Sequence, residues 1–144
     1  MPKKMLLPVL MMASFAVGIA RPARAEDRNA ALHDAMTASG AWLKLLDDGQ
    51  YAASWQQAGS FFRDHITSDA WARQIAAVRQ PLGAMKSRKF KAAQYATQLP
   101  GAPAGQYVVI QYDTDYANKA DAVETVTPML DKDGKWRVSG YYIR

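Results

Sequence analysis

The chain has 144 residues, of which 18 are Lys or Arg and 13 are Asp or Glu, and it contains no cysteine. Without cysteine there can be no disulfide and no lipid-modified N-terminal cysteine, so a folded domain must depend on its core alone. Four basic residues and no acidic ones lie within positions 1–25, which leaves 14 basic and 13 acidic residues, a net charge of +1, for the rest. A nucleic-acid partner, which would need a strongly positive surface, is therefore not expected.

The first 25 residues have the pattern of a signal peptide. Two lysines precede an apolar run over residues 5–20, and Ala23-Arg24-Ala25 has the form of a small-x-small cleavage site. The run is shorter than the roughly 20 residues that span a bilayer; an uncleaved anchor is the alternative. We therefore expect cleavage after Ala25 and export to the periplasm or beyond. Residues 26–144 should form one domain without a transmembrane segment.

The residues that follow have the period of helices. Apolar side chains recur along one face of residues 29–46, of residues 50–63, and of a third segment whose N-cap is Thr67 or Ser68. Pro81 is expected to end the third helix. Because each segment carries an apolar stripe, the three helices should pack together on one face of a sheet.

The second half of the chain is rich in β-branched and aromatic residues, which favour strands. Strands are predicted over residues 85–98, 105–116, 121–130 and 135–144, with the last two joined by a turn at Asp133-Gly134. All the helices precede all the strands, which indicates an α+β domain rather than a parallel α/β fold. The prediction is three N-terminal helices packed on a curved four-stranded antiparallel sheet.

Several stretches resemble the exported bacterial family known as domain of unknown function 4019. They are Asp48-Gly49-Gln50-Tyr51 in the helical half, Gln111-Tyr112-Asp113-Thr114 and Glu124-Thr125-Val126-Thr127-Pro128 in two strands, and residues 133–143 at the end. The resemblance covers nearly all of residues 26–144 and implies no known activity. The order of helices and strands is also similar to the cone-shaped nuclear-transport-factor-2-like superfamily, or to cystatin-like folds. The former resemblance implies a pocket between helices and sheet.

Patterns that indicate catalysis or metal binding are scarce. The two histidines, His33 and His65, lie on different predicted helices without the spacing of metal ligands, so neither a metal nor another cofactor is expected. No nucleophile motif is present. Asp64 and His65 are weak acid-base candidates, because one buried carboxylate or imidazole in a pocket can act alone. A solvated helix end is the alternative explanation for both residues.

Polar and aromatic strand residues are stronger candidates for a binding site. The candidates are Tyr95, Gln111, Asp113, Arg137 and Tyr141. On the two-residue period of a strand, Gln111 shares a face with Asp113, and Arg137 shares one with Tyr141. If both faces line the concave side of the sheet, polar groups converge over an apolar floor, as in many pockets. The alternative is a charge pair between Asp113 and Arg137 on the solvent side, and a bulge at Gly140 would swap the faces.

Residues 86–91 contain a basic cluster, which either contacts anionic envelope polymers or protects an edge strand from pairing. The tyrosines of the strands favour core packing or a homodimer through the sheet. Taken together, the sequence favours a non-enzymatic domain that binds a small ligand or an envelope protein. A pocket enzyme of the isomerase or hydrolase type, and envelope binding through residues 86–91, are the alternatives.

Overall fold

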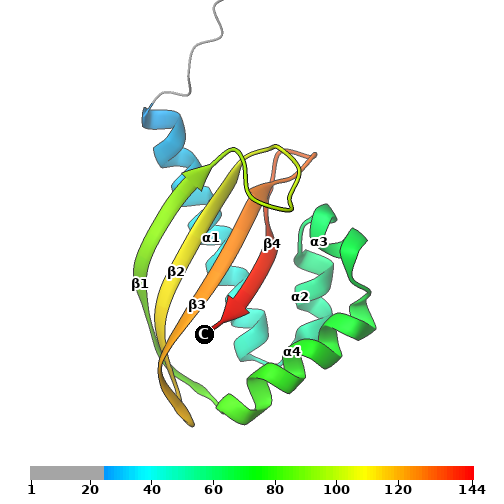
Figure 1. Cartoon of the computed structure of the whole chain (residues 1–144), viewed down its shortest axis with the longest axis vertical. Helices are drawn as coiled ribbons and strands as arrows, with labels where there is room; N and C mark the ends of the chain where they lie inside the picture. The colour runs from blue at the N-terminus through cyan, green and yellow to red at the C-terminus, as the bar shows by residue number, and fades with distance from the viewer. Residues whose placement is uncertain (1–24) are drawn as a thin grey trace, which may run out of the picture.

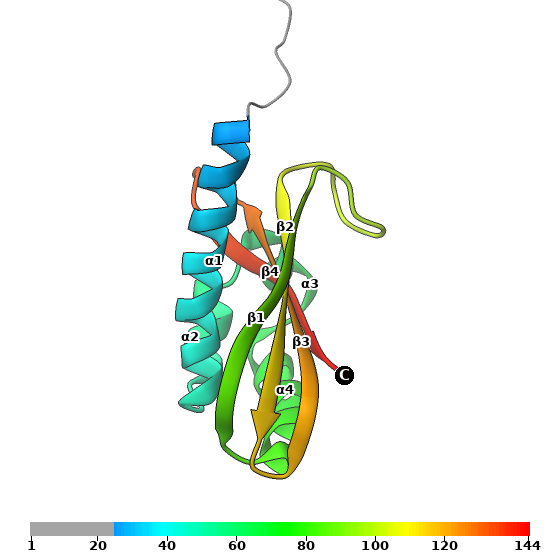
Figure 2. The same cartoon turned by 90° about the vertical axis from the view of Figure 1, so that its left-hand side faces the viewer.

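The computed structural model describes residues 25–144, and its first helix lies along the sheet. α1 (Ala25–Asp47) runs behind the four strands in Figure 1, and Figure 2 shows α1 and α2 on one side of the sheet. Gly49 adopts the left-handed region with φ 72°, which stops the helix. The leader predicted over residues 1–25 lies outside the described residues except for Ala25.

Between residues 25 and 82 the chain forms four helices rather than the three predicted. α2 (Tyr51–Gln57) and α3 (Ser60–His65) replace the single helix expected over residues 50–63. Between them the backbone is extended, and the Gly59 N–H donates to the backbone oxygen of Val138 at 2.7 Å. A Cβ on Gly59 would lie 3.4 Å from that oxygen, an ordinary contact distance, so the hydrogen bond to Val138 accounts for the break in the helix.

α4 (Ser68–Leu82) begins where the sequence predicts and ends slightly later. The Thr67 hydroxyl accepts a hydrogen bond from the Ala70 N–H at 3.2 Å, which confirms the N-cap. Pro81 lies inside the last turn instead of ending the helix. A proline so close to the end removes a single backbone hydrogen bond, and the chain leaves the helix at Gly83, whose φ is 75°.

The sheet is an antiparallel meander in the order β1-β2-β3-β4, which confirms the α+β class. Its strands are β1 (Met85–Ala96), β2 (Tyr107–Tyr116), β3 (Lys119–Leu130) and β4 (Trp136–Ile143). β1 and β4 are the two edges. The predicted turn at Asp133-Gly134 is confirmed, because the Gly134 N–H donates to the Asp131 backbone oxygen at 2.9 Å. Figure 1 shows the curved sheet, with α2, α3 and α4 beside β4.

The core lies between the sheet and the helices and is rich in tryptophan. Trp42 of α1 and Trp71 of α4 are buried, with ring centroids 5.9 Å apart. Their indole N–H groups donate to the backbone oxygen and to the hydroxyl of Ser54 on α2, at 2.8 Å and 2.9 Å. Each buried aromatic side chain stabilises the fold by about 2 to 3 kcal/mol. The tryptophans and Ser54 therefore hold α1, α2 and α4 together.

Candidate functional site

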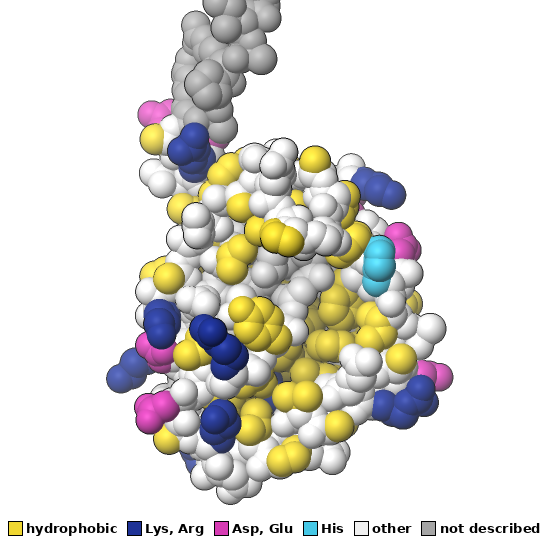
Figure 3. All heavy atoms as spheres, viewed as in Figure 1, with side chains coloured by type: hydrophobic (Ala, Val, Ile, Leu, Met, Phe, Trp, Pro, Cys, Tyr) yellow, Lys and Arg dark blue, Asp and Glu magenta, His cyan; other side chains and the backbone are white. Residues whose placement is uncertain are grey.

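A narrow groove of about 210 Å³ separates α4 from β4. Its walls are Trp71, Gln74, Ile75 and Val78 on the helix, and Tyr141, Tyr142 and Ile143 on the strand. The helix residues are three or four positions apart, so they share one face. Trp71 and Ile75 are buried, whereas Val78 and Tyr142 are 48% and 52% exposed. Figure 3 shows this side of the molecule hollowed between strand and helices, with hydrophobic side chains in the hollow.

A bulge in β4 determines which side chains reach the groove. Pro128 pairs with Val138 and Thr127 pairs with Gly140, so Ser139 is the extra residue of β4. Val138 and Tyr141 therefore both pack against the helices, although they are three residues apart. The same bulge separates Tyr141 from Arg137, which the two-residue period of a strand places on one face.

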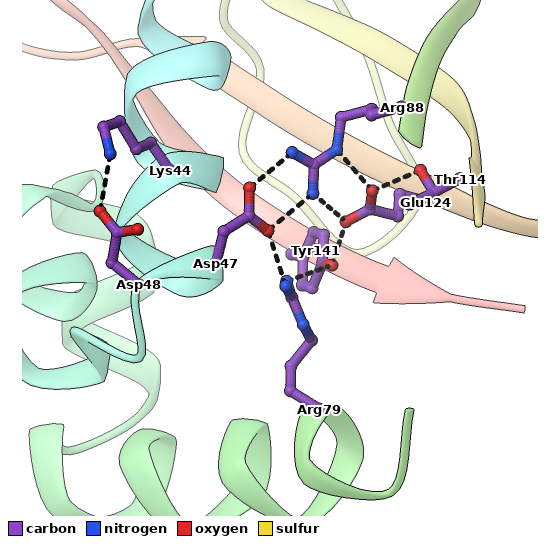
Figure 4. A network of polar contacts seen from close by, with 8 residues as sticks. All are labelled: Lys44, Asp47, Asp48, Arg79, Arg88, Thr114, Glu124 and Tyr141. Atoms are coloured by element: carbon purple, nitrogen blue, oxygen red, sulfur yellow. Dashed lines mark hydrogen bonds and ion pairs between the residues drawn. The ribbon is translucent and has the colours of Figure 1, made fainter. Parts of the chain in front are cut away.

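Tyr141 links the groove to a buried network of charges. Arg88 on β1 donates to Glu124 Oε1 through Nε at 2.7 Å and to Asp47 Oδ2 through Nη1 at 2.8 Å. Arg79 on α4 donates to the other oxygen of Asp47 at 2.6 Å. The two guanidinium groups balance the two carboxylates, of which Glu124 is fully buried. Figure 4 shows Asp47 between the two arginines.

Hydroxyl groups complete this network. Glu124 accepts hydrogen bonds from the hydroxyls of Thr114, at 2.5 Å, and of Tyr141. The guanidinium of Arg79 lies over the ring of Tyr116, 5.0 Å from its centroid, which is a cation–π contact. Two helices and all four strands thus contribute a side chain, and the network ties the helices to the sheet.

The electrostatics of the network favour one protonation state for each group. Burial would raise the pKa values of Glu124 and Asp47, but hydrogen bonds from arginine outweigh it and lower both pKa values. Burial, reinforced by the Glu124 charge, raises the pKa of Tyr141 and raises the pKa of Tyr116 to about 12. A general acid or base needs a pKa near the working pH. The network is therefore suited to fixing the helices on the sheet rather than to proton transfer.

Gln111 and Asp113 lie on the other side of the sheet from the helices. Every second residue of β2 from Val108 to Tyr116 is buried against the helices, whereas Gln111 is half-buried and Asp113 is exposed. Asp113 lies 3.4 Å from Lys91 on β1, while Arg137 donates to Asp133 in its own hairpin at 2.6 Å. The suggested charge pair between Asp113 and Arg137 is wrong, because β3 separates their strands.

Tyr95, Asp64 and His65 also lie away from the groove. The Tyr95 hydroxyl donates to the Gln106 side-chain oxygen at 3.2 Å. Asp64 and His65 are exposed at the end of α3, and Asp64 borders a second hollow of about 510 Å³ beside the loop of residues 97–106. Of the binding and acid-base residues predicted from the sequence, Tyr141 is the one that borders the groove.

Sequence reasoning missed the charged residues of the network. Arg79 continues the apolar stripe of α4, four residues after Ile75, and it is 5% exposed. Glu124 lies on the buried face of β3, two residues before Val126. A charge within an apolar stripe is the signal that could have identified both, because a buried charge requires a partner.

The basic cluster at residues 86–91 is also weaker than the sequence indicates. Arg88 is 13% exposed, and its charge is matched within the network. Lys86, Lys89 and Lys91 are exposed along β1, and Lys91 is paired with an aspartate. The reduced positive field disfavours envelope binding through this strand.

Within residues 25–144, no three His, Asp or Glu side chains are grouped as a metal site requires. None of the helices in that range combines the length and the apolar character needed to cross a membrane.

Comparison with known proteins places the chain in a family. Residues 38–141 match the family model described as "Protein of unknown function (DUF4019)". No curated protein and no solved structure matches the chain. The matched range contains every residue of the charge network and covers more than half of the sequence. The chain therefore belongs to the DUF4019 family of proteins of unknown function.

Proposed function

We infer that this protein is an exported, non-enzymatic binding domain whose groove between α4 and β4 holds a small ligand or part of a protein partner. The leader pattern of residues 1–25 supports export. The observation that carries the binding role is the exposed hydrophobic surface of the groove. Three large hydrophobic side chains are strongly exposed among residues 25–144, namely Val78, Phe90 and Tyr142, and two of them border this groove.

The walls of the groove are held in place from inside the protein. The Tyr141 ring packs edge-on against Trp42 with a centroid distance of 5.3 Å, and its hydroxyl donates to Glu124. The Trp71 ring packs edge-on against Phe62, and its N–H donates to Ser54. A preformed site loses less conformational entropy when a ligand binds. Rigid walls with an apolar surface therefore favour a binding role.

The neighbouring network supports binding rather than catalysis. At neutral pH the carboxyl groups of Asp47 and Glu124 are ionised and the phenols of Tyr116 and Tyr141 are protonated, as their shifted pKa values require. None of these four groups can readily exchange a proton with a bound molecule. For this reason the enzyme alternative finds no support in the groups nearest to the groove.

Titration with the uncharged, apolar fluorescent dye Nile red tests the binding role. We expect saturable dye binding that Val78→Arg abolishes, because a cation on the helix wall disrupts the apolar surface. Phe90→Arg is the matched control: Phe90 is 53% exposed but lies on β1, outside the groove, so dye binding should persist. Equal loss in both variants, with circular dichroism unchanged, would contradict the assignment, as would a lack of saturable binding.

Export is tested separately by the mass of the protein recovered from the cell envelope. A chain that begins at Glu26 supports cleavage after Ala25, and a chain that retains the leader contradicts it. A homodimer through the sheet remains a prediction, which the native mass of the same sample tests.

A further inference from the structure

The free edge of β4 presents backbone groups inside the groove. Arg144 and Val123 exchange two backbone hydrogen bonds, each 3.0 Å long. In antiparallel strands hydrogen-bonded and non-hydrogen-bonded pairs alternate, so the backbone groups of Tyr141 and Ile143 point away from β3. In the described part of the chain no residue bonds to them. Two N–H groups and two carbonyl oxygens are therefore open to an added strand.

The two edges of the sheet differ in their protection against added strands. β1 has two irregularities in its register and three exposed lysines, at positions 86, 89 and 91, and both features discourage pairing. β4 carries no charged side chain between Val138 and Ile143. The tyrosines and isoleucine of this stretch favour strand pairing. β4 is thus the more receptive edge.

Neighbouring elements restrict what can be added to β4. The Gly59 N–H occupies the Val138 oxygen, so the open stretch begins after Val138. α4 lies across the groove from β4 (Figure 1), and a second copy of the fold would meet this helix before its own edge could approach. The groove, at about 210 Å³, is smaller than the roughly 300 to 1,000 Å³ of small-molecule pockets. The groove can therefore take one or two apolar side chains of a partner whose backbone runs along the open edge of β4. A single strand can approach this edge beside α4.

Charge further defines the chemistry of the added strand. The Arg144 side chain is exposed at the end of the open stretch and forms no ion pair with the residues described. The side chains of the groove walls are uncharged. A complementary strand therefore carries uncharged side chains where it faces the groove and an acidic residue beside Arg144.

We propose that the groove binds an extended segment of a protein partner, which joins β4 as a fifth strand of the sheet. The segment is an uncharged, β-branched stretch of about five residues with an acidic residue at the end beside Arg144. This inference rests on the proposed function and names the partner class of the same site. Main-chain hydrogen bonds supply affinity, and the apolar walls select the side chains.

Blocked peptides of about six residues provide the probe, since that length spans the open edge. Thr and Val alternate along them, and a Glu stands at either the first or the last position. Two further sets of peptides carry methyl groups on the backbone nitrogens of the odd or of the even residues. Methylation removes the N–H hydrogen-bond donors of those residues but keeps every side chain. One methylated set should bind about tenfold more weakly and the other set like the parent peptide, because alternate residues face β4.

Variants and amide exchange test the protein side of the contact. Ile143→Pro removes an outward N–H without removing a bond to β3, and it should weaken peptide binding about tenfold, as should Val78→Arg. Phe90→Arg should leave binding unchanged. Bound peptide should slow amide exchange at Tyr141 and Ile143 but not at Tyr142, which already pairs with β3. The exchange measurement uses the unaltered protein, so it remains decisive if a variant fails to fold.

The outcomes separate this inference from the proposed function. Strand addition is overturned if no peptide binds, or if the two methylated sets bind equally well. In either case, dye binding that Val78→Arg abolishes leaves the binding role intact. If the unaltered protein binds neither the dye nor the peptides, both the binding role and strand addition are overturned. Protection of Tyr141 and Ile143 without peptide, in a sample that becomes dimeric, assigns the edge to a second copy and also overturns the inference.

Discussion

Replacing Arg88 with methionine should destabilise the fold more than any change of an exposed charge. The Arg88 side chain is 13% exposed and makes four hydrogen bonds, two to Asp47 and two to Glu124. Methionine keeps most of the apolar stem but leaves the buried Glu124 carboxylate with two hydroxyl donors and no opposite charge in contact. Breaking a buried ion pair by removing one partner costs about 3 to 5 kcal/mol. That is a large part of the total stability of about 5 to 15 kcal/mol that domains have.

Urea unfolding, followed by tryptophan fluorescence at neutral pH, measures this loss as a fall in the free energy of unfolding. Lys44→Met is the matched control, because Lys44 on α1 forms an exposed ion pair with Asp48, the residue after the helix, at 2.8 Å, also drawn in Figure 4. The control should leave the urea midpoint unchanged. Adding Glu124→Leu to Arg88→Met should recover part of the loss, since it removes the unpaired carboxylate. An Arg88→Met midpoint equal to that of the control would refute the reasoning.

Two further predictions concern acid and the cap of α4. The pKa values of Asp47 and Glu124 are lowered in the fold from 3.8 and 4.5, so their stabilising contribution is present above these values and is lost as the pH falls through the lower folded values. Urea titrations between neutral pH and strong acid should show this loss, and Glu124→Gln should flatten it; an unchanged slope would contradict the assignment. Thr67→Ala removes the hydroxyl that accepts from the Ala70 N–H and should lower the free energy of unfolding by about 1 kcal/mol, with Ser68→Ala as the neutral control. Equal urea midpoints for these two variants would show that Thr67 is not the cap.

The strands and most helix boundaries could be predicted from the sequence because their signals are local. Alternating β-branched residues, the Asp133-Gly134 turn and the Thr67 cap depend on neighbours in the chain. The break at Gly59 depends on β4, more than seventy residues away, whose Val138 oxygen accepts from its N–H. No local pattern distinguishes that glycine from one tolerated within a helix.

The site was harder to predict for the same reason. Tyr141 was among the candidates, but the two-residue period joined it to Arg137, and the extra residue Ser139 separates them. Arg88 was assigned to an exposed basic cluster, because an arginine in a lysine-rich strand resembles a solvated one. Its burial depends on ion pairs with Asp47 on α1 and Glu124 on β3, which are distant in the sequence. Pairing across distant elements is a property of the fold and not of any single segment.

The contact between Arg79 and Tyr141 has a consequence for how this protein could change over time. Arg79 Nη1 lies 3.5 Å from the Tyr141 hydroxyl oxygen, and the two residues belong to α4 and β4, the elements that form the two walls of the groove. Hydrogen bonds fix distance and direction, whereas apolar contacts tolerate sliding. Well-packed hydrophobic residues in place of such a network often preserve stability. A descendant that replaced the network with apolar residues could therefore still fold. The distance between the two walls would then be less fixed, and the fit of a bound segment between them would change.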